Sequence, residues 1–137
     1  MLVEFNVKDG EDRIAEGIYR LQNLGYIPIL AHAERYKNLS AGRIWSFREN
    51  GVLVQINTES LISVKDFGQK KRVRTLIEKG YVDFVSTDTH DLKRRPPEMD
   101  KSYEIFVEKY GKRYADDLFC NNALRIFGRK TSEEETK

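Results

Sequence analysis

Both histidines of this 137-residue chain stand where an apolar run breaks into polar residues. The two breaks read HAER and STDTH, and they supply these side chains: His32, Glu34, Arg35, Asp88 and His90. Imidazole nitrogens together with carboxylate oxygens are the donors that Mn²⁺, Zn²⁺ or Fe²⁺ select. Asp88 and His90 are two residues apart, so their side chains would point the same way in an extended segment. These residue types therefore predict a divalent metal site.

Each histidine also has an interpretation that needs no metal. A histidine at the end of a strand is usually a hydrogen-bonded core or surface residue, and STDTHD could form a turn held by local hydrogen bonds. Glu4, in the apolar stretch LVEFN, is harder to explain in this way. An unpaired carboxylate in a buried strand is costly, unless the strand lies at an edge or the charge meets a cation. Gln55 and Asn57 are expected to satisfy backbone groups.

Two basic clusters, QKKRVR (69–74) and LKRR (92–95), could bind phosphate groups. A basic run on a helix is more often a solvated face, and the net charge of the chain is only +2. Aromatic residues do not interleave with these charges. We therefore rank nucleic-acid binding low and expect no nucleic-acid partner.

An alternation of strand and helix patterns would position the polar side chains. The predicted strands are residues 2–6, 26–32, 52–57 and 81–89. The predicted helices are residues 11–25, 40–51, 70–80, 97–110 and 114–127. The alternation predicts an α/β fold of about four parallel strands with crossover helices, followed by C-terminal helices. In such folds, chemistry gathers where the strands end, so the polar termini should converge.

The composition is that of an ordinary globular protein, with 39% hydrophobic and 34% charged residues. The apolar runs are far shorter than the roughly 20 residues of a membrane span, and the start MLVEF has no signal-peptide pattern. The single cysteine, Cys120, cannot form an internal disulfide and is expected to be a buried, inert thiol. We expect a cytoplasmic protein without a membrane span.

Four motifs in order give the chain a resemblance to a known family. LVEF, GYIPILAHAERY, GVLVQIN..SL and VDFVSTDTHD....R closely resemble the bacterial capsular-polysaccharide tyrosine phosphatases of the PHP (polymerase and histidinol phosphatase) superfamily. The interval from Glu4 to His32 and the interval from Asp88 to Arg95 both match that family. Ala33 and Thr89 stand where proline and alanine are common, and neither position supplies a ligand.

The resemblance implies a fold, a reaction and a set of site residues. Family members are distorted (β/α)₇ barrels whose trinuclear, typically manganese, site hydrolyses phosphotyrosine esters; Fe²⁺, Zn²⁺ or Mg²⁺ are alternatives. The implied metal ligands are Glu4, His32, Asp88 and His90. The implied catalytic residues are Asp88 and His90 with two phosphate-clamping arginines, Arg35 and Arg95. The implied substrate is a phosphotyrosine protein, such as a tyrosine kinase that regulates capsule or exopolysaccharide export.

The resemblance covers only the C-terminal part of the family's barrel. Residues 1–128 are assigned to that part, and the charged residues 129–137 are expected to form a flexible tail. The family's N-terminal His-x-His strand and further ligands have no counterpart here, so we expect the isolated chain to bind metal weakly and to turn over poorly. Its sheet edges would pair with a second copy or with a separate N-terminal half. The alternatives are a non-catalytic binding or assembly module and a phosphoesterase for small phosphate esters.

Overall fold

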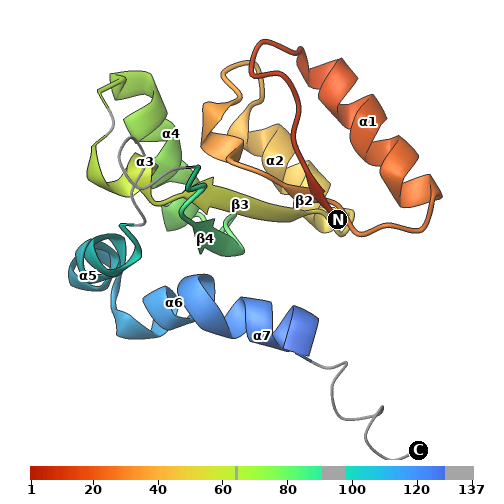
Figure 1. Cartoon of the computed structure of the whole chain (residues 1–137). Coiled ribbons are helices and arrows are strands. Elements are labelled where there is room, and N and C mark those ends of the chain that lie inside the picture. The colour runs from red at the N-terminus through yellow and green to blue at the C-terminus, as the bar shows by residue number, and fades with distance from the viewer. Residues whose placement is uncertain (64, 91–97, 129–137) are drawn as a thin grey trace, which may run out of the picture.

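The computed structural model describes residues 1–63, 65–90 and 98–128. It contains one parallel sheet of four strands in the order β1-β2-β3-β4, so each strand lies beside the next strand along the chain (Figure 1). The strands are β1 (Leu2–Val3), β2 (Ile29–Leu30), β3 (Leu53–Asn57) and β4 (Phe84–Ser86). Arg95, the cluster at 92–95 and the predicted tail lie outside the described residues.

Helices connect every pair of neighbouring strands. The connecting helices are α1 (Glu11–Asn23), the 3₁₀ helix η1 (Ala33–Arg35), α2 (Ala41–Glu49), α3 (Glu59–Ile62) and α4 (Phe67–Glu78). After β4 come α5 (Met99–Tyr110), α6 (Lys112–Asp116), the π-helical segment η2 (Asp117–Asn121) and α7 (Asn122–Phe127). Figure 1 shows α1, α2 and α4 above the sheet, α6 and α7 in a row below β4, and α5 at the left end of that row. None of the helices in the described ranges is long and apolar enough to cross a membrane.

This architecture confirms the predicted α/β fold, with four parallel strands, crossover helices and C-terminal helices. The strands are shorter than their patterns predicted. The fourth ends at Ser86 because Asp88 adopts a left-handed backbone, with φ of 51°, which no strand can continue through. The first ends at Val3, and the Asp9 N–H then closes a turn on the Asn6 carbonyl at 2.9 Å.

The core lies between the sheet and its helices, and the C-terminal helices contribute Phe106, Ala115 and Leu118 to it. Leu30, Val54 and Ile56 of the strands are fully buried together with Ile14 of α1 and Leu76 of α4. Burying a side chain of this size stabilises the fold by about 1.5–3 kcal/mol. Glycines with positive φ follow α1, α2 and α4, at Gly25, Gly51 and Gly80, whereas α4 begins at Phe67, three residues before its predicted start. The core therefore fixes the strands in register, and with them the polar residues at the strand ends.

The prediction for Cys120 is wrong, because the residue lies exposed in η2. The sequence pattern assumed 3.6 residues per turn, whereas η2 is π-helical and its wider turn shifts the buried face. Leu118 of the same segment is buried. The thiol therefore takes no part in the core.

Candidate active site at the carboxyl ends of the strands

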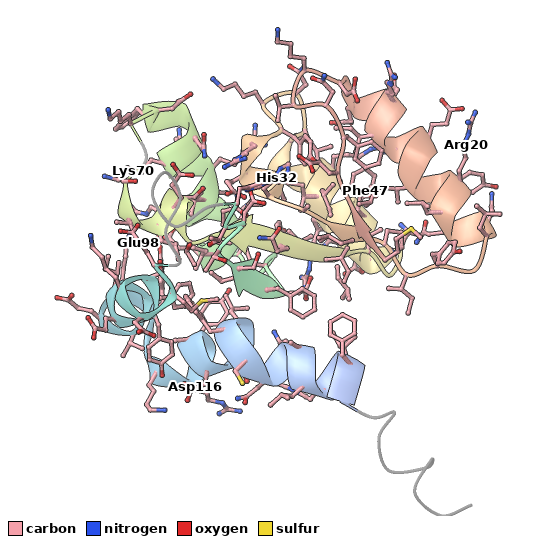
Figure 2. The ribbon with its side chains drawn as sticks, in the orientation of Figure 1. Arg20, His32, Phe47, Lys70, Glu98 and Asp116 are labelled. Carbon is pink, nitrogen blue, oxygen red and sulfur yellow. The ribbon has the colours of Figure 1, made fainter. Side chains whose placement is uncertain are left out.

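The end of β1 meets the end of β2 through Glu4 and His32. The Glu4 Oε1 atom lies 2.8 Å from the His32 Nε2 atom. The His32 side chain is only 4% exposed, whereas that of Glu4 is 72% exposed, and Figure 2 shows His32 in the interior of the molecule. Glu4 lies beyond the last residue of an edge strand and faces an imidazole, so its carboxylate avoids the cost of burial without a partner.

The backbone is strained at two of the predicted ligands. In the described ranges, the non-glycine residues with positive φ are His32, at 37°, and Asp88, at 51°. Asp and His tolerate the left-handed region better than most residues, but it still costs about 1–3 kcal/mol and tends to occur at functional sites. Both strained residues lie just past the end of a strand, where the sequence predicts a metal site.

A chain of hydrogen bonds links these two residues across β3 and β4. The His32 N–H donates to Gln55 Oε1 at 2.7 Å, and Gln55 Nε2 donates to Asn57 Oδ1 at 2.9 Å and to Ser86 Oγ at 2.7 Å. Asn57 Nδ2 then donates to Asp88 Oδ2 at 3.2 Å. Gln55 satisfies backbone groups as predicted, but the side chain of Asn57 bonds to other side chains. The network therefore positions one predicted ligand relative to another.

Glu34 is a buried carboxylate directly behind the network. It is 1% exposed, and its Oε1 atom accepts hydrogen bonds from the Asn57 N–H at 3.1 Å and from Ser60 Oγ at 2.5 Å. Its Oε2 atom has no hydrogen-bond partner among the described residues. Burial raises the pKa of the Glu34 carboxyl above its ordinary value. Glu34 ties η1 to the end of β3, a role that its place in HAER did not reveal.

Arg35 extends from η1 toward two carboxylates. Its Nη1 atom lies 3.6 Å from Asp88 Oδ2, and its Nη2 atom lies 3.5 Å from Glu59 Oε2. These separations are longer than the usual 2.7–2.9 Å of charge-assisted hydrogen bonds, so the guanidinium keeps donor capacity for an incoming anion. The sequence predicted Arg35 as a site residue but missed Glu59, an exposed residue in a polar stretch.

His90 is close to Asp88, but not for the predicted reason. Its Nδ1 atom lies 2.7 Å from the Asp88 carbonyl oxygen and 3.9 Å from the Asp88 Oδ1 atom. The segment is not extended, because the left-handed Asp88 turns the chain back. The His90 side chain is 65% exposed. The structure thus brings together Glu4 with His32, and Asp88 with Arg35 and His90.

The donors at this edge fit a divalent metal in kind. Imidazole and carboxylate suit Mn²⁺, Fe²⁺ or Zn²⁺, and the buried His32 Nδ1 atom has no hydrogen-bond partner in the described part of the chain. They do not fit in number, because residues 1–63, 65–90 and 98–128 contain no group of three or more His, Cys, Asp or Glu side chains that could hold an ion. Protein metal sites usually have at least three protein ligands.

Comparison with known proteins places this site in a family context. Residues 1–128 match the sequence model of the family described as capsular polysaccharide synthesis, CpsB/CapC. The tyrosine-protein phosphatase CpsB of Streptococcus pneumoniae is 35% identical over 132 residues, which cover 91% of this chain and 54% of that protein. The tyrosine-protein phosphatase YwqE of Bacillus subtilis is 30% identical over 116 residues, which cover 81% of this chain and 44% of that protein.

The fold comparison agrees with the sequence comparison. A solved structure from a study of YwqE of Bacillus subtilis and CpsB of Streptococcus pneumoniae, described as metal-dependent tyrosine phosphatases, aligns with a TM-score of 0.70 at 29% identity. The alignment covers 82% of this chain and 47% of that one. The chain therefore spans about half the length of the relatives it matches. On the family match, the identities and the shared fold, this chain belongs to the CpsB/CapC capsular polysaccharide synthesis family.

Proposed function

We propose that this chain supplies part of the active site of a metal-dependent protein-tyrosine phosphatase. The observation that carries the proposal is the hydrogen-bond chain at one sheet edge that connects the Glu4–His32 pair to Asp88, which lies beside Arg35. The names of the relatives support phosphotyrosine as the substrate class. Residues 1–128 would then be the C-terminal portion of a PHP-type barrel.

Four residues would supply ligands to a metal centre of several ions: Glu4 and His32 to one ion, Asp88 to a second and His90 to a third. A bound divalent ion, which we propose to be Mn²⁺, would lower the pKa of a water molecule and make hydroxide available near neutral pH. The chain itself contributes by positioning these ligands. Gln55 and Asn57 hold the His32 backbone and the Asp88 carboxylate at a fixed separation. Side chains held in place in this way need not be reordered when a metal and a substrate bind.

Arg35 would bind the phosphate of the substrate. Its guanidinium can donate two parallel hydrogen bonds to phosphate oxygens and offset the charge that develops on them. Glu59 and Asp88 orient the side chain, at 3.5 and 3.6 Å, without saturating its donors. We assign a second phosphate contact to Arg95 on the strength of the family resemblance alone.

The partners follow from the same proposal. The substrate would be a phosphotyrosine protein, and a tyrosine kinase that regulates capsule or exopolysaccharide export is the specific partner we propose. The remaining ligands would come from a second copy or from an N-terminal half of the barrel. A cytoplasmic location stays a prediction from the sequence.

A second candidate function is a non-catalytic binding or assembly module. It is favoured by the number of donors, since the described residues contain no set of three that could hold an ion. On this alternative the residues at the sheet edge would be structural. Asp88→Asn would then change neither metal content nor activity.

Hydrolysis of a tyrosine-phosphorylated peptide across a Mn²⁺ titration tests the proposal. Asp88→Asn keeps a residue type that tolerates positive φ but removes the negative charge. We expect Mn²⁺-dependent turnover that falls at least about 10- to 100-fold in this variant, the loss already typical of residues that only position ligands. Glu108→Gln, an exposed change on α5, is the matched control. If the wild-type chain is folded but hydrolyses no peptide at any Mn²⁺ concentration, the proposal that it contains a working site would be refuted. The non-catalytic binding or assembly module would then be favoured.

A further inference from the structure

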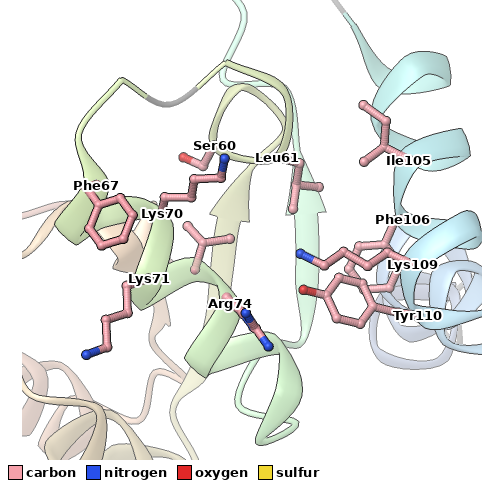
Figure 3. Close-up of a pocket in the computed structure, with 11 residues that line it drawn as sticks. Ser60, Leu61, Phe67, Lys70, Lys71, Arg74, Ile105, Phe106, Lys109 and Tyr110 are labelled. Atoms are coloured by element: carbon pink, nitrogen blue, oxygen red, sulfur yellow. The ribbon is translucent and has the colours of Figure 1, made fainter.

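Helices α4 and α5 border a cavity of about 450 Å³, and none of the proposed metal ligands lines it (Figure 3). Its wall is apolar, with Leu61, Val73, Ile105 and Phe106. Phe106 is 0% exposed and Val73 is 4% exposed, so they belong to the core as well as to the cavity wall. Pockets of 300–1,000 Å³ with apolar walls are the usual size and character of ligand sites. The volume would hold one or two large side chains.

The rim of this cavity is positively charged. Lys70, Lys71 and Arg74 come from α4, and Lys109 comes from α5. Figure 3 shows Arg74 and Lys109 reaching into the gap from opposite helices, with Lys70 directed toward Ser60. No carboxylate lines the cavity among the described residues. Like charges gathered around an apolar hollow repel one another, so the site favours an anionic occupant.

The ion pairs leave most of this charge uncompensated. Arg74 pairs with Glu78 at 2.7 Å, whereas Lys70, Lys71 and Lys109 form no ion pair within the described part of the chain. Lys109 Nζ instead lies 5.3 Å from the centre of the Tyr110 ring. The cluster QKKRVR is therefore more than a solvated helix face, because one side of it borders an apolar cavity.

An exposed aromatic residue stands at the same place. Phe67, which begins α4, is 82% exposed and lines the cavity together with the lysines. Aromatic rings and cations around an apolar hollow suit an acidic peptide that carries an aromatic or aliphatic side chain. A nucleic acid fits less well, because its phosphates would follow the charge along a surface and leave the apolar wall without a contact.

The cavity adjoins the candidate active site through Ser60. Ser60 lines this cavity, and it also lines a neighbouring hollow that contains Arg35, the proposed phosphate ligand. The same hydroxyl donates to Glu34 at 2.5 Å, so its position is fixed. A peptide with its phosphotyrosine at Arg35 could pass over Ser60 and reach the space between α4 and α5.

We propose that the cavity between α4 and α5 binds an acidic segment of the phosphoprotein substrate, with an aromatic or aliphatic side chain of that segment inserted between Val73 and Phe106. This inference rests on the proposed phosphatase function and extends it to substrate choice. The cavity would raise the affinity for protein substrates, and small phosphate esters would not use it.

The test uses the full chain and two double variants of equal charge change. Lys70→Glu with Lys109→Glu reverses the charge at the cavity, and Lys8→Glu with Lys79→Glu makes the same change at exposed lysines elsewhere. The first readout is fluorescence anisotropy of a labelled, unphosphorylated peptide in which glutamates flank a phenylalanine. We expect the cavity variant to weaken binding at least about tenfold and the control to stay within about twofold. Replacing the peptide's phenylalanine by alanine should also weaken binding to the wild type.

The second readout separates this inference from the phosphatase proposal. If the wild-type chain hydrolyses phosphotyrosine, the cavity variant should have a higher KM for an acidic phosphopeptide than the wild type. Its KM for free phosphotyrosine should be unchanged. Turnover with an unchanged phosphopeptide KM would overturn the cavity proposal alone. If the peptide binds in a way that depends on the cavity but no substrate is hydrolysed, the phosphatase proposal would be refuted and the cavity proposal would stand. The cavity proposal would also be overturned if both double variants lost the same amount of peptide affinity. It would be overturned as well if an oligonucleotide displaced the labelled peptide at a lower concentration than the unlabelled peptide does.

Discussion

At the scale of single residues, the site depends on a few side chains. The sequence shows which residues they are, but it does not show their conformations. Glu4, His32, Asp88 and His90 could be selected from residue type and position at strand ends. The left-handed backbone of His32 and Asp88 could not be predicted, because contacts from other strands impose it. For His32 the contact is the hydrogen bond to Gln55, which is 23 residues away in the chain.

A substitution at Gln55 that keeps the side-chain volume should disturb the hydrogen-bond network of the site. Gln55→Met keeps the shape of the side chain but removes its bonds to the His32 N–H, Asn57 and Ser86. Because those buried groups lose their partner, we expect the free energy of unfolding to fall by about 1–3 kcal/mol. The urea midpoint measures it, with Gln22→Met as the control at a more exposed position. An unchanged midpoint would show that the network has no structural role.

Glu34 gives the stability a dependence on pH. Burial raises its folded-state pKa above the ordinary value of 4.5, so the folded protein binds this proton more tightly than the unfolded chain does. The contribution of Glu34 is then most favourable below pH 4.5 and is lost as pH rises through the raised folded pKa. Glu34→Gln keeps the acceptor oxygen and cannot ionise.

We therefore expect the Tm of Glu34→Gln, relative to wild type, to increase between pH 4 and pH 7. Scanning calorimetry of the two proteins in matched buffers measures this difference, in which the other titrating groups cancel. A difference that does not vary with pH would mean that Glu34 has an ordinary pKa in the folded state.

At the scale of elements, the sequence predicted the order of strands and helices but not where the strands end. The alternation of patterns was enough for four parallel strands, because consecutive strands of this kind need helical crossovers. Strand ends depend on tertiary contacts. The segment after β1 is held by Tyr36, whose buried hydroxyl accepts a hydrogen bond from the Phe5 N–H at 3.0 Å. Nothing in the pattern LVEFN indicates that contact.

Tyr36→Phe tests this contact between η1 and the end of β1. The variant leaves the Phe5 N–H without its acceptor, and we expect a loss of about 1–2 kcal/mol in unfolding free energy. The segment bearing Glu4 should loosen as well, so amide hydrogen exchange around residues 4–6 should accelerate. Tyr19→Phe, at an exposed position of α1, is the control. Unchanged exchange at 4–6 would contradict the role given to Tyr36.

At the scale of the whole molecule, the described sheet begins at an edge strand with exposed apolar residues beside it. Leu2 of β1 is 64% exposed, and Ile27, just before β2, is 61% exposed. Edge strands are usually paired or covered. This arrangement supports the proposal that further ligands come from a second copy or another part of a barrel. This expectation came from the family resemblance, because the patterns within the sequence describe only the strands that it contains.

The central claim is that the strand ends form a divalent metal site, and direct measurement of Mn²⁺ binding tests it most simply. Electron paramagnetic resonance of free Mn²⁺, titrated with the full chain, gives affinity and stoichiometry without any need for turnover. Glu4→Gln removes a largely exposed carboxylate with little effect on the fold, and Glu108→Gln is its control on α5. We expect the wild type and the control to bind Mn²⁺ alike and Glu4→Gln to bind at least about tenfold more weakly. Equal binding by all three proteins, or none by the wild type, would contradict the claim.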